Sequence, residues 1–156
     1  MNIYAVMLEQ LYIPIKGLLE ATESVLSTEI VSSQETVDSI ARYALKNGGK
    51  RIRPILFLLA ARVAGANHES LPRLAAIVEM LHTASLMHDD VVDDAMIRRG
   101  QPSTKAKWGN QVSVLVGDLL LCRASKILVE FGNAKLMEAV NCAISRRNRS
   151  VNIITS

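Results

Sequence analysis

Aromatic side chains are scarce in this sequence, since Phe, Trp and Tyr together make up 4% of its 156 residues. Hydrophobic residues as a whole reach 49%, so a buried core must be mainly aliphatic. The scarcity also leaves no row of rings on which nucleic-acid bases could stack. We therefore expect no nucleic acid among the partners of this protein.

Cysteine, glycine, proline and long apolar runs are limited as well. Cys122 and Cys142 match no metal-binding spacing and, with no signal peptide recognised, indicate reduced thiols in a cytoplasmic protein. The longest apolar runs, around residues 55–66 and 112–122, are too short or too charged to form a transmembrane segment. Glycine and proline number only 8 and 4, which is typical of a helix-rich globular domain.

The net charge of +3 belongs to the end of the chain. Without Arg146, Arg147 and Arg149 the sequence would have 15 basic and 15 acidic residues. The segment SRRNRSVNIITS also lacks a periodic apolar face. We therefore expect a helical domain over residues 1–143 and, over 144–156, an atypical basic tail that is disordered or not native to the fold.

Apolar residues recur at helical spacing along most of the chain, and no alternating pattern of convincing length predicts a strand. The fold class expected is therefore all-α. The helix that starts near Pro54 is apolar on nearly every side and is expected to be central. The predicted helices cover residues 1–27 (broken at Pro14), 34–47 (ending at Gly48-Gly49), 54–66, 71–94, 110–131 and 134–145, with a loop at 95–109.

Four aspartates lie within six residues of the sequence LHTASLMHDDVVDDAMIRRG, which spans residues 81–100. On a helix, His82, Asp89 and Asp93 fall within roughly 20° of one another around the axis. Two carboxylates stacked in this way repel each other, and a divalent cation removes that repulsion. Oxygen ligands without cysteine suit Mg²⁺, which is usually completed by water and substrate phosphates.

Arg98 and Arg99 follow the aspartates immediately, and guanidinium groups bind phosphate oxygens in pairs of hydrogen bonds. The alternative interpretation of the acidic cluster is a solvated helix end. The arginines favour a site that binds metal and phosphate together, because an acidic cluster beside a basic pair calls for a bridging ligand.

A second basic group lies in GGKRIRP at residues 48–54, where a glycine turn leads into a predicted helix start. Lys50 and Arg53 are three residues apart and can point to the same side. With His82 and Arg99 they would form a second anion pocket. The alternatives are a solvated basic surface for this group and a hydrogen-bonded core histidine for His82.

These segments resemble the trans-isoprenyl diphosphate synthases, and among them the long-chain, octaprenyl-type polyprenyl diphosphate synthases most. The resemblance rests on GGKRIRP at 48–54, LHTASLMHDDVVDDAMIRRGQP at 81–102 and WGNQVSVLVGDLLL at 108–121, and it covers most of residues 35–140. The DDVVD at 89–93 is similar to the family's first aspartate-rich motif, a DDxxD pattern. The resemblance implies an isoprenoid-synthase-type helical bundle and a homodimer.

The resemblance also implies a reaction, the Mg²⁺-dependent condensation of an allylic prenyl diphosphate with isopentenyl diphosphate. Asp89 and Asp93 would hold Mg²⁺, with Asp90 in support, and Arg98 would bind the allylic diphosphate. Isopentenyl diphosphate would be bound by Lys50, Arg53, His82 and Arg99. The small residues Ala84 and Ser85, about one turn before the first aspartate, would permit a long product chain.

The family's second aspartate-rich motif has no counterpart here, because the acidic residues after Asp94 are single: Asp118, Glu130 and Glu138. The resemblance therefore implies the N-terminal half of the family's domain. Two hypotheses follow. The chain represents a prenyl-transferring enzyme, or it is a non-catalytic fragment or subunit that binds diphosphate or a full-length synthase.

Overall fold

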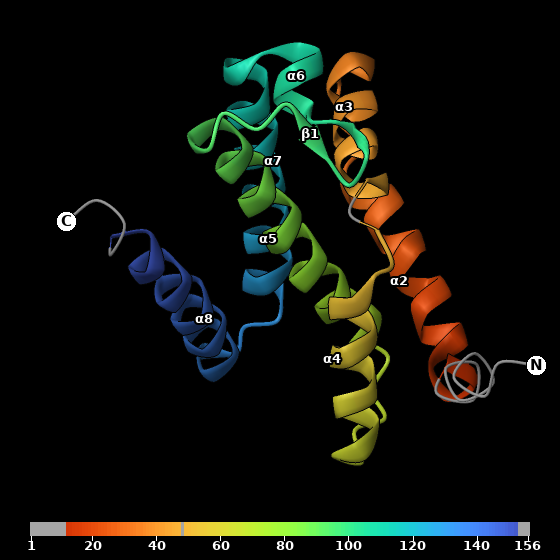
Figure 1. Cartoon of the computed structure of the whole chain (residues 1–156). Helices are drawn as coiled ribbons and strands as arrows, with labels where there is room; N and C mark the ends of the chain where they lie inside the picture. Colours follow the sequence, from red (N-terminus) through yellow and green to blue (C-terminus); the bar gives the residue numbers. More distant parts are fainter. Residues whose placement is uncertain (1–11, 48, 153–156) are drawn as a thin grey trace, which may run out of the picture.

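The computed structural model describes residues 12–47 and 49–152, and Figure 1 shows that these residues are mostly helical. Two short strands form the one small sheet of the described residues. The all-α prediction is therefore confirmed. The elements are η1 (Ile13–Ile15), α2 (Lys16–Glu29), α3 (Glu35–Lys46), α4 (Ile52–Val63), α5 (Leu71–Val92), β1 (Ile97–Arg98), β2 (Gln101–Pro102), α6 (Thr104–Trp108), α7 (Asn110–Glu130) and α8 (Ala134–Asn152).

Helix α5 is the centre of the fold. Helices α2, α3, α4, α6 and α7 all pack against it, and its contact with α7 is the most extensive (Figure 1). The helix begins at Leu71-Pro72, where proline is tolerated because the amides of a first helical turn have no partner within the helix. The helix that carries the predicted metal face is thus held on several sides.

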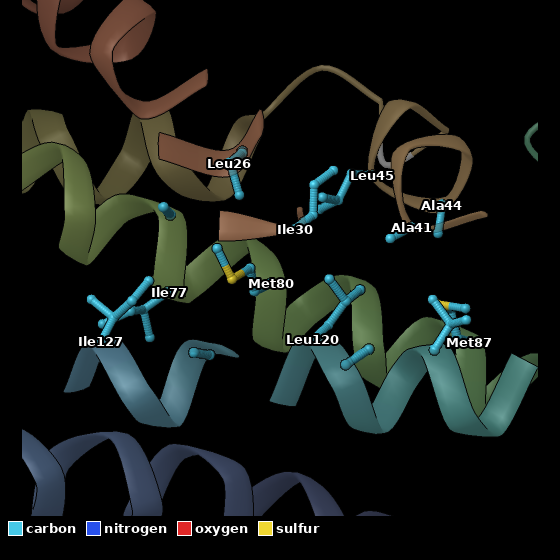
Figure 2. Packing of buried hydrophobic residues seen from close by; sticks show 14 of the residues in the cluster. Leu26, Ile30, Ala41, Ala44, Leu45, Ile77, Met80, Met87, Leu120 and Ile127 are labelled. Atoms are coloured by element: carbon cyan, nitrogen blue, oxygen red, sulfur yellow. The ribbon is translucent and has the colours of Figure 1, made fainter. Parts of the chain in front are cut away.

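The main core lies where α5 meets α2, α3 and α7. Figure 2 shows Ile77, Met80 and Met87 of α5 between Leu120 and Ile127 of α7 and side chains from α2 and α3. Every buried hydrophobic side chain among the described residues is aliphatic or methionine. This agrees with the aliphatic core expected from the composition, in which flexible methionines fill irregular gaps.

The prediction that the helix near Pro54 is central is wrong. Helix α4 packs on α5, α2 and η1 at one side of the bundle, and it begins two residues earlier than predicted. Pro54 lies in its first turn, where its missing N–H is still not needed. Ile52, Leu56 and Val63 are 56%, 59% and 90% exposed. The apolar sequence of α4 predicted that the whole helix would be buried, but only one side of the helix packs against the bundle.

The loop predicted over residues 95–109 contains structure of its own. Strands β1 and β2 pair antiparallel, and Arg99 and Gly100 between them have φ angles of 51° and 77°. Positive φ at both central residues is the signature of a type I′ turn, which suits the twist of a two-residue hairpin. Ser103 then caps the short helix α6 by accepting a hydrogen bond from the Ala106 amide at 3.1 Å.

The predictions for the two ends of the chain fall partly outside the described residues. Pro14 lies in η1, directly before α2, while residues 1–11 of the predicted broken helix lie outside the described residues. Helix α8 continues to Asn152, so the helix runs nine residues into the predicted tail; that residues 144–156 are disordered or not native to the fold stays a prediction. Arginine is a good helix former, so the three arginines of this segment are compatible with a helix. None of the described helices is both long and apolar enough to span a membrane.

Candidate functional site

The aspartate-rich segment forms the C-terminal end of α5, which stops at Val92 rather than at Asp94. The Asp93 amide still donates to the Asp89 carbonyl at 2.8 Å, so these two residues remain one turn apart. Asp94 adopts a φ of 53°, and the Ala95 amide donates to the Asp90 carbonyl at 2.9 Å. This is a Schellman helix end with aspartate where glycine is usual. Asp89 is half-buried and Asp93 is exposed.

Asp90 points away from the side of α5 that carries Asp89 and Asp93, and it is paired with Arg98. Its side chain is 4% exposed, and its Oδ1 accepts from Nε and Nη2 of Arg98 at 2.7 and 2.6 Å. The hydrogen bond with Asp90 raises the pKa of Arg98, with the charges of Asp89 and Asp93 adding to it and burial opposing it. Arg98 is therefore held, fully charged, beside the two stacked carboxylates.

The donor set at the end of α5 can be tested against the magnesium ion that the aspartate spacing suggests. Asp89 and Asp93 offer hard oxygen atoms one turn apart, whereas Asp90 is occupied by Arg98. Nowhere in the described part of the chain do three or more His, Cys, Asp or Glu side chains gather around a possible ion position. Two carboxylates fit Mg²⁺ that completes its shell with water and phosphate oxygens, rather than an all-protein cage.

The predicted basic group forms a pocket of about 400 Å³. Three separate segments build it: the turn before α4, the middle of α5 and the turn of the hairpin. The structure thus brings together all four residues predicted to form the second anion pocket. Its lining residues are Gly49, Lys50, Ile52, Arg53, Glu79, His82 and Arg99.

Arg53 and His82 are in direct contact in this pocket, with Nη1 of Arg53 2.8 Å from Nε2 of His82. Arginine can only donate, so Nε2 of His82 is the acceptor in this contact. The start of α4 at Ile52 adds the partial positive charge of a helix N-terminus. The pocket therefore attracts anions and offers several donors.

Gly49 is favoured by the positive φ of the turn, and the end of a neighbouring side chain lies against it. Its φ is 89°, and a Cβ atom at this position would overlap the guanidinium of Arg99. Nη1 of Arg99 also lies 3.5 Å from the Asn47 carbonyl. The glycine turn thus brings the backbone into close approach to the guanidinium of Arg99.

Glu79 is the pocket residue that the sequence analysis missed. It is 1% exposed, and burial raises its pKa above the ordinary value while the nearby charge of Arg51 lowers it. Glu79 is a single acidic residue within an apolar part of α5, so no sequence motif marks it as a site residue. Its position three residues before His82, on the same face of α5, was the available signal.

The two residues predicted to govern product length differ in their burial. Ala84 is completely buried in the main core cluster, and its carbonyl lies close to Gly117 of α7. Ser85 is half-buried and donates to the His82 carbonyl at 2.6 Å. Their role in chain length stays a prediction, as do the ligands of the other site residues.

Comparison with known proteins places these features in one family. Residues 34–149 match the sequence profile of the family described as polyprenyl synthetase. An all-trans-nonaprenyl-diphosphate synthase (geranyl-diphosphate specific) of Rhodobacter capsulatus is 44% identical over 126 residues, which are 80% of this chain and 39% of that protein. The octaprenyl diphosphate synthase of Escherichia coli K12 is 38% identical over 117 residues, 75% of this chain and 36% of that protein.

A solved structure agrees with the sequence matches. The polyprenyl synthase from Caulobacter crescentus CB15, complexed with calcium and isoprenyl diphosphate, superposes with a TM-score of 0.81 at 36% identity, covering 86% of this chain and 41% of that one. The chain thus spans about two fifths of the length of these relatives. The match confirms the resemblance inferred from the motifs. The chain belongs to the polyprenyl synthetase family.

Proposed function

We propose that this chain provides the substrate-binding wall of a polyprenyl diphosphate synthase. The reaction would be the head-to-tail condensation of an allylic prenyl diphosphate with isopentenyl diphosphate, giving a long-chain all-trans polyprenyl diphosphate in the cytoplasm. The observation that carries the proposal is the basic pocket, where Lys50, Arg53, His82 and Arg99 converge on the helix that ends in the aspartate-rich segment. The names of the relatives, which include nonaprenyl and octaprenyl diphosphate synthases, support a long product.

Each group has a role that follows from its chemistry. Lys50, Arg53, Arg99 and His82 would bind isopentenyl diphosphate, since a diphosphate needs several charged or polar donors. Arg98, positioned by Asp90, would bind the allylic diphosphate. Asp89 and Asp93 would hold Mg²⁺, which when bound would neutralise charge on the departing diphosphate. The calcium and isoprenyl diphosphate in the Caulobacter crescentus complex support the pairing of a divalent cation with a diphosphate in this family.

In the proposed reaction the bond between the allylic carbon and its diphosphate breaks, and the diphosphate leaves with the electron pair. The double bond of isopentenyl diphosphate forms the new carbon–carbon bond, and loss of a proton restores an alkene. Arg98 would stabilise the leaving group electrostatically. An aliphatic surrounding protects the cationic carbon from water. The product would then grow past Ala84 and Ser85, which are too small to block it.

The direct test is turnover of labelled isopentenyl diphosphate with farnesyl diphosphate and Mg²⁺, with products sized by chromatography. Binding of each diphosphate, with and without Mg²⁺, should be measured in parallel by calorimetry. We expect Asp89→Ala and Asp93→Ala to abolish the Mg²⁺-dependent part of binding. The exposed Glu138 on α8 provides a control, because Glu138→Ala removes a carboxylate far from the pocket. Unchanged Mg²⁺ dependence in both aspartate variants would reject the metal assignment.

A second function is favoured by the lack, within the described residues, of a third metal ligand beside Asp89 and Asp93. In that case the chain would bind diphosphate without turnover, as a subunit of a homodimer or as a partner of a full-length synthase. Binding without product formation, and product formation only after a full-length synthase is added, would support this alternative. Long-chain products from the chain alone would exclude it.

A further inference from the structure

Arg51 lies between two residues of the basic pocket but does not line it. It is the N-cap of α4, with φ 51° and ψ 32°, which is the left-handed region. A residue with a side chain is disfavoured there because its Cβ crowds the backbone, and glycine is the usual solution. The presence of arginine at this strained position therefore calls for an explanation in its side chain.

The guanidinium of Arg51 joins three helices. Its Nε and Nη2 donate to the two carboxylate oxygens of Glu23 in α2, at 2.5 and 3.1 Å. Its Nη1 donates to the Leu45 carbonyl in α3 at 2.5 Å and to Glu79 in α5 at 3.1 Å. The side chain of Arg51 is only 16% exposed, whereas that of its partner Glu23 is 47% exposed. A lysine could not reproduce this planar fork.

Arg51 affects the pocket in two ways, through its backbone carbonyl and through its guanidinium. The Arg51 carbonyl accepts the Ile55 amide at 3.0 Å, so the position of Arg51 sets the start of α4 and with it the neighbouring Lys50 and Arg53. Arg51 also balances the charge of Glu79, a buried carboxylate that lines a pocket otherwise suited to anions. Without Arg51 the buried side chain of Glu79 would lose its charged hydrogen-bond partner at the wall of the pocket.

We infer that Arg51 is a positioning residue, which anchors the turn carrying Lys50 and Arg53 to α2, α3 and α5 and so shapes the anion pocket without touching the ligand. The inference rests on the proposed function for the identity of the ligand, isopentenyl diphosphate. It adds Glu23 of α2 to the residues on which the pocket depends, although Glu23 is not among the residues that line it.

The test compares Arg51→Gly and Arg51→Lys with the unaltered 156-residue chain. Glycine relieves the left-handed strain, so a residue that served only the turn would tolerate it. We expect instead that both variants bind isopentenyl diphosphate about tenfold more weakly or worse, by calorimetry. Asp94→Gly is the matched control, because Asp94 has a φ of 53° and an ion pair with Lys105 but lies outside the pocket. It should bind as the unaltered chain does.

Hydrogen exchange separates positioning from a general loss of stability. In Arg51→Lys we expect the Ile55 amide to exchange faster, while the Leu120 amide in the core of α7 exchanges as before. Faster exchange at both amides with unchanged affinity would show a purely structural role and overturn the inference. So would wild-type binding by Arg51→Gly. If the unaltered chain does not bind isopentenyl diphosphate, the proposed function fails, and Ile55 exchange still decides the role of Arg51.

Discussion

Removal of Arg98 is expected to destabilise the protein more than removal of its partner Asp90. The asymmetry follows from burial, because the side chain of Asp90 is 4% exposed and that of Arg98 is 30% exposed. In Arg98→Met a carboxylate is left inside the protein without its two hydrogen bonds. In Asp90→Asn an acceptor oxygen remains, and the arginine that loses its charged partner can still reach water.

The size of the difference can be estimated from these contacts. Breaking a buried ion pair by removing one partner costs about 3–5 kcal/mol, and the partial exposure of Arg98 places this case near about 3 kcal/mol. For Asp90→Asn the loss should be about 1 kcal/mol, the usual contribution of a single hydrogen bond. In a chain of this length these values correspond to falls in Tm of about 6–12 °C and about 2–4 °C.

Urea denaturation at neutral pH, followed by circular dichroism, measures both losses. The double variant Arg98→Met/Asp90→Asn should recover about 2 kcal/mol relative to the sum of the single losses, since it leaves no unpaired buried charge. Equal losses in the two single variants would refute the reasoning, as would a double variant that is simply additive. The result also matters for function: lost activity in an Arg98 variant proves a substrate contact only if the variant is folded.

Three further predictions concern Gly49 and Glu79 of the basic pocket and the buried Thr83. Gly49→Ala should displace Arg99 and weaken isopentenyl diphosphate binding. Gly65 is the control, because it has a similar φ of 74° and an added Cβ would meet no atom within 4 Å, so Gly65→Ala should reduce only stability. Equal affinity of the two variants for isopentenyl diphosphate in calorimetry would contradict this. Thr83→Val should raise stability by about 1 kcal/mol in urea denaturation, because the buried Thr83 hydroxyl has no partner among the described residues. A loss would instead indicate a hydrogen bond through water in the adjoining cavity of about 20 Å³. Burial raises the pKa of Glu79, so the folded state keeps the Glu79 proton to higher pH than the unfolded state does. The free energy of unfolding should therefore fall as the pH rises from the ordinary pKa of glutamate through the raised pKa of Glu79. Glu79→Gln should flatten that part of the profile in denaturation from about pH 4 to 8, and an unchanged slope would contradict the assignment.

The helices that the sequence predicted well are those with clear periodic faces and glycine ends. Helices α3 and α7 were placed within one or two residues, because Gly48-Gly49 and Gly132 mark where each must stop. The end of α5 was placed two residues too late, since Asp94 takes the left-handed conformation that glycine normally signals. Local rules find a helix end most reliably when the residue with positive φ is glycine.

In the candidate site, too, the arrangement within one helix could be predicted from the sequence, whereas contacts between distant segments could not. The stacking of Asp89 on Asp93 follows from helical spacing alone, and the structure keeps it. The pairing of Asp90 with Arg98 depends on a hairpin that was not predicted, because its type I′ turn is Arg-Gly rather than the usual Asn-Gly. The partners of Arg51 lie 28 residues away on either side, in Glu23 and Glu79, and no spacing rule reaches that far.

The hairpin explains how one short segment can serve two anion sites. Arg98 is the last residue of β1 and turns inward to Asp90, at the end of the aspartate-rich helix. Arg99 is the first residue of the turn, and its positive φ sends its side chain to Gly49 in the basic pocket. Two consecutive arginines in a regular helix would differ by about 100° in direction but start from the same surface. The tight turn separates them more completely, so the spacing between the two proposed diphosphate sites depends on Gly100 keeping its φ of 77°.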